Sequence, residues 1–184
     1  MLPWGHLAVG YLLYSAGVRL VADRKPAGLP VISLAIGTQF PDLVDKPLAD
    51  VLNLLPSGRS LGHSLLFTLV LLAVVYLLAR RYDRLPEAIA FSFGHISHIV
   101  ADALPAAIAG EWAKLGFLGW PITPAYRYSA DVEGRVITEY LFIQLTSSPH
   151  HELVLFVFAA GLWFYDGMPG FGEVMNWLEM RREN

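Results

Sequence analysis

Apolar residues form five segments along the chain, and a His or Asp stands close to one end of each of the first four. The segments cover residues 4–22, 29–40, 61–79, 86–104 and 149–168. Apolar runs of this kind predict helices, and a helix needs about 20 such residues to cross a bilayer. Segment 29–40 is short, so it is either a half-span or continues into residues 42–55. The pattern predicts an all-α, multispan helical membrane protein with four to five transmembrane helices.

Basic residues stand at or just after the ends of the first, third and fifth segments. They are Arg19, Arg24 and Lys25, then Arg80, Arg81 and Arg84, and finally Arg181 and Arg182. The positive-inside rule puts such clusters on the cytoplasmic side. Strict alternation of five spans satisfies all three clusters, and it predicts a multi-pass protein of the cell membrane with its N-terminus outside. The polar ends of the first four segments then meet at the outer end of one helix bundle. These ends carry His6, Asp42, His63 and Asp102.

The composition agrees with a membrane protein. The 184 residues are 55% hydrophobic and 16% charged, below the roughly 25% charged residues of soluble domains. The length indicates one domain, residues 1–184. A net charge of -3 argues against nucleic acid as a ligand, so the expected partners are the lipid bilayer and a small-molecule or lipid-like substrate. Because there is no Cys, disulfides and thiolate metal sites are excluded.

Three polar residues in segment 86–104 are the first candidates for chemistry. His98 and Asp102 are four residues apart, which places them on one helix face about 6 Å apart along the axis. This pair can bind one metal ion. His95 lies about 10 Å from Asp102 along the axis, so it suits a position behind the ligands or at a second ion. A lone His in an apolar helix is more often simply packed, whereas the His–Asp pair in such a run favours a functional site.

Asp42 and Asp45 form a second acidic unit directly after Pro41. Three residues apart on a helix, both can face one site. The alternative is helix capping, because Pro41 can start a helix and acidic residues are favoured in the first turn. Helix capping explains Asp45 better than it explains Asp42.

The run 59–64 brings a basic residue and a His to the same end. Ser60 is a candidate helix cap, which does not explain why His63 enters an apolar run. Arg59 either binds an anionic substrate group or is an interfacial side chain that reaches towards water. No nucleophile elbow surrounds Ser64, so we place it beside the site rather than in the reaction.

Whether the remaining candidates belong to the site depends on the end of the bundle at which they lie. His6 becomes a possible ligand because it shares an end with the other polar residues. His150 and His151 either bind the same ion or mark an interface. The aromatic, Pro-broken stretch 115–124 either dips into the membrane or roofs the site, or is an interfacial anchor. Residues 136–146 predict a short amphipathic helix.

Taken in order, these motifs resemble the YdjM-like family, described as LexA-binding, inner-membrane-associated, metal-dependent hydrolases. That family has an early His, a Pro-Asp-x-Asp-like element, a His-Arg-Gly-x-Thr-His-Ser element, a Gly-x-x-Ser-His-x-x-x-Asp element and a later Trp-Pro. The corresponding residues here are His6, 41–45, 59–64, 94–102 and 119–121. The resemblance covers most of residues 1–124, and it implies a multispan membrane protein with metal-dependent hydrolase activity.

The chain departs from the family pattern at three points. Asp45 stands one residue later than in the compact Pro-Asp-x-Asp form. The region around Ser57 and Gly58 replaces the first His of the His-Arg-Gly element, which removes one potential ligand. His95 is not part of the pattern. The chain also lacks the basic surface or DNA-reading motif that would accompany LexA binding.

The motifs and the resemblance together predict a membrane-embedded, metal-dependent hydrolase. The expected metal ligands are His6, Asp42, His63, His98 and Asp102, which would hold one or two ions of Zn²⁺ or Mn²⁺. The ion would activate water, and Asp45 or Asp102 would accept the proton. Arg59 would stabilise the anionic substrate or transition state, and the substrate would be a phosphoester or a lipid-like molecule.

Three other functions fit the same residues. A membrane carrier that relays protons or ions would use His95 and Asp102, although clustering at one end rather than near the midplane argues against it. A metal-stabilised structural membrane protein would bind metal without turnover. A soluble all-α metallohydrolase is also consistent with the sequence, because segment 61–79 is the one unambiguous span.

Overall fold

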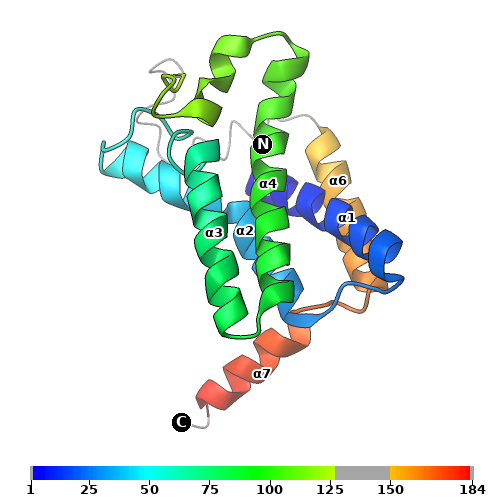
Figure 1. Cartoon of the computed structure of the whole chain (residues 1–184). Coiled ribbons are helices and arrows are strands. Elements are labelled where there is room, and N and C mark those ends of the chain that lie inside the picture. The colour runs from blue at the N-terminus through cyan, green and yellow to red at the C-terminus, as the bar shows by residue number, and fades with distance from the viewer. Residues whose placement is uncertain (1, 127–149, 183–184) are drawn as a thin grey trace.

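The computed structural model describes residues 2–126 and 150–182, and every regular element in this part of the chain is helical (Figure 1). The α-helices are α1 (Pro3–Ala22), α2 (Gly28–Lys46), α3 (Leu65–Arg81), α4 (Leu85–Ile108), α6 (His150–Tyr165) and α7 (Phe171–Arg182). A π-helical turn, η1 (Pro47–Val51), extends α2, and a 3-10 helix, η2 (Trp112–Gly119), follows α4. The all-α part of the expectation therefore holds for the described residues.

The prediction of transmembrane helices is wrong for the described residues. Within residues 2–126 and 150–182, no helix combines the length and the apolar character needed to cross a membrane. Helix α3 covers most of the clearest predicted span, yet its 17 residues rise only roughly 26 Å against a hydrocarbon core of about 30 Å. Helix α4 has 24 residues but carries His95, His98 and Asp102 within its apolar run. The multi-pass arrangement is therefore not supported.

Two helix boundaries differ from the simplest sequence interpretation. Pro41 lies inside α2, so segment 29–40 continues past residue 42, as one of the two alternatives had it. Helix α3 begins at residue 65 because residues 61–64 form a turn. Its N-cap is Ser64, whose Oγ accepts a hydrogen bond from Leu66 N at 3.2 Å, and the predicted cap at Ser60 is wrong. The helix predicted at 136–146 lies outside the described residues.

The crossing of α2 and α4 is the central contact of the fold, and α3 runs beside α4 in the opposite direction (Figure 1). The α2 and α4 backbones come unusually close. A Cβ on Gly94 would lie 2.4 Å from the carbonyl oxygen of Leu34, and a Cβ on Gly37 would lie 2.2 Å from that of Phe91. Only glycine permits this approach. The crossing brings the middle of α2 against the His-bearing half of α4.

Helix α1 packs against α2, α4 and α6. Part of this contact is an apolar cluster formed by Tyr11, Val31, Leu34 and Ala90. The other part is polar and centres on Asp166, directly after α6. Its carboxylate accepts hydrogen bonds from the hydroxyls of Tyr11 at 2.7 Å and Ser15 at 3.0 Å. Arg19 forms an ion pair with the same carboxylate. These contacts hold α1 against its neighbours, and His6 in its first turns is also buried.

Candidate metal centre

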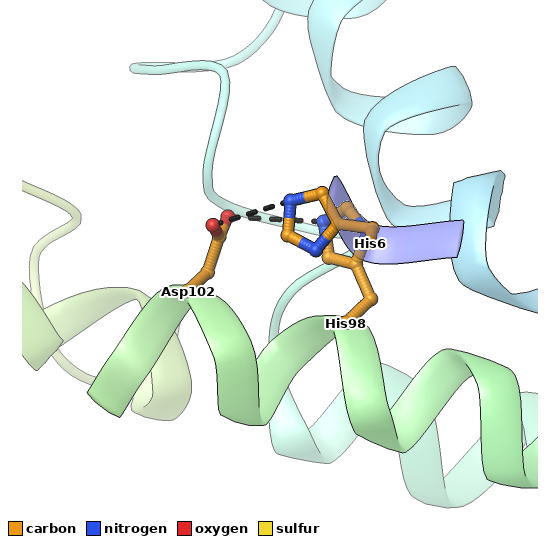
Figure 2. A group of neighbouring side chains, drawn as sticks. All are labelled: His6, His98 and Asp102. Atoms are coloured by element: carbon orange, nitrogen blue, oxygen red, sulfur yellow. Dashed lines mark ion pairs between the residues drawn. The ribbon is translucent and has the colours of Figure 1, made fainter. Parts of the chain in front are cut away.

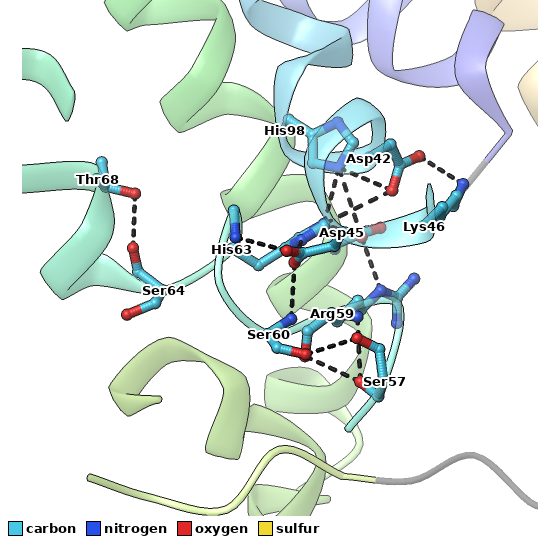
Figure 3. Close-up of polar contacts among 12 residues, drawn as sticks. Asp42, Asp45, Lys46, Ser57, Arg59, Ser60, His63, Ser64, Thr68 and His98 are labelled. Carbon is cyan, nitrogen blue, oxygen red and sulfur yellow. Dashed lines mark hydrogen bonds and ion pairs between the residues drawn. The ribbon is translucent and has the colours of Figure 1, made fainter. Parts of the chain in front are cut away.

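Two imidazoles meet at the centre of the polar cluster. His63 lies in the turn before α3, and His98 lies on the buried side of α4. Both side chains are fully buried, and their Nε2 atoms are 3.1 Å apart (Figure 3). Helix geometry alone does not relate two residues so far apart in sequence, so this pair is a product of tertiary packing.

A hydrogen bond behind each ring determines which nitrogen carries its proton. His98 Nδ1 is 2.6 Å from the carbonyl oxygen of Thr38. A carbonyl only accepts, so this Nδ1 carries a hydrogen. His63 Nδ1 donates to Asp45 Oδ2 at 2.8 Å. In the neutral rings both Nε2 lone pairs then face each other, and a cation or a proton between them is needed to stabilise the pair. Metal-binding His side chains are oriented by hydrogen bonds of this kind.

The pKa values of the two rings move in opposite directions. Burial lowers the pKa of His98 to about 4. Burial acts on His63 in the same sense, but its hydrogen bonds with Asp102 and Asp45 outweigh it and raise its pKa. A proton between the rings is therefore held more strongly by His63 than by His98.

Two carboxylates lie next to this pair of nitrogen atoms. Asp42 Oδ1 is 3.7 Å and 3.8 Å from the two Nε2 atoms, and Asp102 Oδ2 is 3.5 Å and 3.7 Å from them. Each carboxylate also has a basic partner: Lys46 Nζ is 2.6 Å from Asp42 Oδ2, and Arg59 Nε is 2.8 Å from Asp102 Oδ2. Burial alone would raise the pKa of Asp102, but the hydrogen bond with His63 and the charge of Arg59 hold it well below its ordinary value.

The spacing of these donors fits a divalent ion. Ligand atoms about 2.0–2.1 Å from a tetrahedral ion lie about 3.3–3.4 Å from one another. The N–N and N–O distances around the two imidazoles are 3.1–3.8 Å. Two groups of potential ligands, each with its atoms within 4.8 Å of one another, occur among the described residues: Asp42, His63 and His98, and His6, His98 and Asp102. Imidazole with carboxylate is a donor set that Zn²⁺ and Mn²⁺ accept.

His6 extends the cluster from the first turns of α1. Its ring stacks on that of His98, with centroids 3.7 Å apart and an interplanar angle of 16°. Its Nε2 is 3.4 Å from Asp102 Oδ1 (Figure 2). Burial lowers the pKa of His6 to about 2, so the ring is neutral. Among the described residues its Nδ1 is buried without a hydrogen-bond partner, which leaves the ring with an unused donor or acceptor.

Asp45 does not contact the two Nε2 atoms. It binds the turn that carries His63 instead. Its fully buried carboxylate accepts hydrogen bonds from the backbone N–H groups of Ser60 and Gly62, both at 2.7 Å, besides the one from the imidazole. A Cβ on Gly62 would lie 2.8 Å from the carbonyl oxygen of Pro41, so the turn lies directly on α2. Asp45 is in neither group of potential ligands, and its catalytic role stays a prediction.

His95 and Ser64 lie beside the site without joining either ligand group. Thr68 Oγ1 donates to the Ser64 carbonyl oxygen at 2.8 Å and therefore accepts from His95 Nε2 at 3.0 Å. Burial lowers the pKa of His95 to about 4. The Ser64 side chain caps α3, as described above. His150 and His151 begin α6, and their side chains are outside the part of the chain that the structure describes.

Two groups at the site, the Thr38 carbonyl and Lys46, did not emerge from the sequence, and a third, Phe117, lies in the stretch 115–124 for which alternatives were left open. Thr38 contributes a backbone carbonyl, which every residue has, so its type carries no signal. Phe117 of η2 is buried and lies edge-on against His63, with ring centroids 5.9 Å apart, which favours the roof among the alternatives for this aromatic stretch. Lys46 is four residues after Asp42, and this helical spacing was a usable signal for their ion pair.

A model of the YdjM inner membrane protein family matches residues 1–168, a range that includes every residue of the cluster. The chain belongs to this family. No curated protein and no solved structure is significantly similar to the chain. The family resemblance expected from the motifs is therefore confirmed. Because YdjM proteins are inner membrane proteins, the match also supports the expected membrane localisation. Helix α7, which begins at Phe171, lies beyond the matched residues.

Proposed function

We propose that this YdjM protein is a metal-dependent hydrolase with its divalent ion at the buried His–Asp cluster. The ligands would be His63, His98, Asp42 and Asp102, with His6 alongside. The observation that carries the proposal is the pair of Nε2 atoms 3.1 Å apart, each on a ring held from behind at Nδ1. Lone pairs aimed at one point favour a cation there. The two neighbouring carboxylates favour a metal ion over a proton, because they add negative charge and oxygen ligands.

The surrounding residues have distinct tasks in this proposal. A Zn²⁺ or Mn²⁺ ion would lower the pKa of a bound water from about 15.7 towards about 7, which supplies hydroxide at neutral pH. Asp45 and the Thr38 carbonyl would keep the imidazoles aligned. Asp102 lies beside the two Nε2 atoms, so it would orient the attacking water and receive its proton. Asp45 is less suited to that task, because it binds His63 at Nδ1, on the side of the ring away from the two Nε2 atoms, and also holds the N–H groups of Ser60 and Gly62.

An anionic phosphoester is the substrate class that the site favours. The Arg59 side chain is 27% exposed while its Nε lies 2.8 Å from Asp102 Oδ2, so the guanidinium reaches both the cluster and the surface. A guanidinium binds phosphate oxygens in a forked geometry and stabilises the charge that develops during hydrolysis. Membership of an inner membrane protein family supports a lipid-like molecule as the carrier of the phosphoester.

The metal content of the purified protein tests the site. We would purify the wild type, His98→Gln and His95→Gln in detergent and measure bound metals by mass spectrometry, with circular dichroism to verify folding. His95 is a matched control, because it is also fully buried and lies on the same helix, yet belongs to neither ligand group. We expect near-stoichiometric metal in the wild type and His95→Gln, and its loss from folded His98→Gln.

Hydrolysis is the second measurement. Turnover of p-nitrophenyl phosphate that depends on Zn²⁺ or Mn²⁺ and is lost in His98→Gln would support the reaction. Stoichiometric metal without turnover of any phosphoester would favour the metal-stabilised structural protein. Equal metal in all three proteins, or none after loading with either ion, would refute the metal centre and favour the proton relay.

A further inference from the structure

The rings of His6 and His98 are close together, but their orientation separates them as metal ligands. They are stacked, with centroids 3.7 Å apart and planes inclined by only 16° (Figure 2). An imidazole nitrogen binds a metal through the lone pair in the plane of its ring, at about 2.0–2.1 Å. Two nearly parallel planes at this separation do not meet within that distance of either ring. One ion therefore cannot be bound in the planes of both rings.

His63 and His98 are the opposite case. Their rings are inclined by 62°, with centroids 5.0 Å apart, and their Nε2 atoms are 3.1 Å apart. Planes this steeply inclined intersect close to the two nitrogen atoms, so both lone pairs can be directed at one ion. His98 is thus suited to share an ion with His63 and not with His6. Distances alone place His6 and His98 in one ligand group, and the orientation of the rings divides that group.

Asp102 reaches the two sides of this division with different oxygen atoms. Its Oδ1 is 3.4 Å from His6 Nε2, whereas its Oδ2 is 3.5 Å and 3.7 Å from the Nε2 atoms of His63 and His98. In Figure 2 the dashed lines from both stacked rings end on this carboxylate. Because each carboxylate oxygen has its own lone pairs, one Asp can bridge two cations. His6 Nε2 and Asp102 Oδ1 are then a ligand pair of their own.

The separation of the stacked rings suits a pair of ions. Both Nε2 atoms face Asp102, so cations bound in the plane of each ring would be about as far apart as the rings themselves, whose centroids are 3.7 Å apart. The two ions of two-metal hydrolytic sites are about 3.5–4 Å apart, which stabilises both the attacking and the leaving oxygen of a phosphoester.

We propose that the cluster has a second divalent-cation site, formed by His6 Nε2 and Asp102 Oδ1, and that Asp102 bridges it to the site at His63 and His98. The proposal rests on the metal centre proposed above, because the two sites share Asp102, but it does not depend on turnover. It assigns the buried His6 ring a direct role as a metal ligand.

The second site should be the weaker of the two. It takes two ligands from the described residues, against four for the first site. Moreover, Nδ1 of His63 and of His98 is held by a hydrogen bond, whereas His6 Nδ1 has no partner within the described part of the chain. Loss of such a partner lowers metal affinity about 10–100-fold. The purified protein would therefore keep the first ion and exchange the second.

Titration of the metal-free protein with Mn²⁺ tests the proposal. Electron paramagnetic resonance counts the bound ions and shows whether two of them are close enough to couple. We would compare the wild type in detergent with His6→Phe and His6→Gln, and verify folding by circular dichroism. Phe keeps a ring on His98 without the nitrogen atom, and Gln is the smaller alternative. His95→Gln is the matched control, because His95 is as buried as His6 and belongs to neither ligand group.

We expect the wild type and His95→Gln to bind two ions with a coupled spectrum, the second about 10–100-fold more weakly than the first. Folded His6 variants should bind one ion with nearly the wild-type affinity and give an uncoupled spectrum.

Several results would overturn the second site and leave the first intact. They are a wild type that binds one ion, two ions that do not couple, and a coupled pair that persists in the His6 variants. Loss of both ions from a folded His6 variant would also overturn it, because His6 would then be a ligand of the first ion. Absence of Mn²⁺ from every protein would refute the first metal centre together with the second.

Discussion

Replacement of Asp45 with Asn tests how the His63 turn is held in position. The buried carboxylate accepts three hydrogen bonds at 2.7–2.8 Å, from Ser60 N, Gly62 N and His63 Nδ1. Asn has nearly the same shape but only one oxygen, and its NH₂ group donates. Whichever way the amide is turned, at least one of the three donors faces another donor.

The expected cost follows from these contacts. One buried donor left without an acceptor costs about 1–3 kcal/mol, and the remaining hydrogen bonds lose roughly 1 kcal/mol of charge assistance. We expect Asp45→Asn to lower the free energy of unfolding by about 3 kcal/mol. For a chain of this size that lowers the Tm by about 6–12 °C. Metal affinity should fall about 10–100-fold, because the His63 imidazole loses the group that orients it.

Thermal unfolding in detergent and metal titration measure the two effects. Asp83→Asn is the matched control, because Asp83 is exposed and its positive φ of 54° is one that Asn tolerates. This control should stay within about 0.5 kcal/mol of the wild type. If Asp45→Asn unfolds at the same temperature as the control and binds metal equally well, the argument that Asp45 orients His63 is refuted.

Two further predictions concern the helix crossing and the anion-binding group. Gly94→Ala places a Cβ 2.4 Å from the Leu34 carbonyl oxygen, so it should cost about 1–3 kcal/mol in thermal unfolding and weaken metal binding. Gly17→Ala in α1, where a Cβ meets nothing within 4 Å, should instead stabilise by up to about 1 kcal/mol, and equal effects would contradict the packing argument. Arg59→Lys should keep the bound metal but lower kcat/KM for a phosphoester roughly 100-fold, because Lys cannot reproduce the forked guanidinium contact with Asp102 and phosphate. An unchanged kcat/KM would remove Arg59 from the reaction.

Several features of the fold follow from local sequence alone. The apolar runs at 4–22 and 86–104 correspond closely to α1 and α4, because helical periodicity is a property of neighbouring residues. His98 and Asp102 share a helix face because their spacing of four residues guarantees it. The membrane spans were wrong for two reasons. Residues 61–64 form a turn, so α3 is shorter than segment 61–79. Helix α4 is long enough, but His95, His98 and Asp102 lower its apolar character.

The division of roles within the site was decided only by the tertiary structure. Asp42 and Asp45 are three residues apart and looked equivalent, yet one lies beside the paired imidazoles and the other binds the turn that carries His63. His98 meets Thr38 because α2 and α4 cross closely, while His95, one turn away, meets Thr68 of α3 instead. A sequence determines which side chains share a helix face, because that spacing is local. Which neighbour each face meets depends on helix crossings and on backbone carbonyls, and these have no signature in the identity of any single residue.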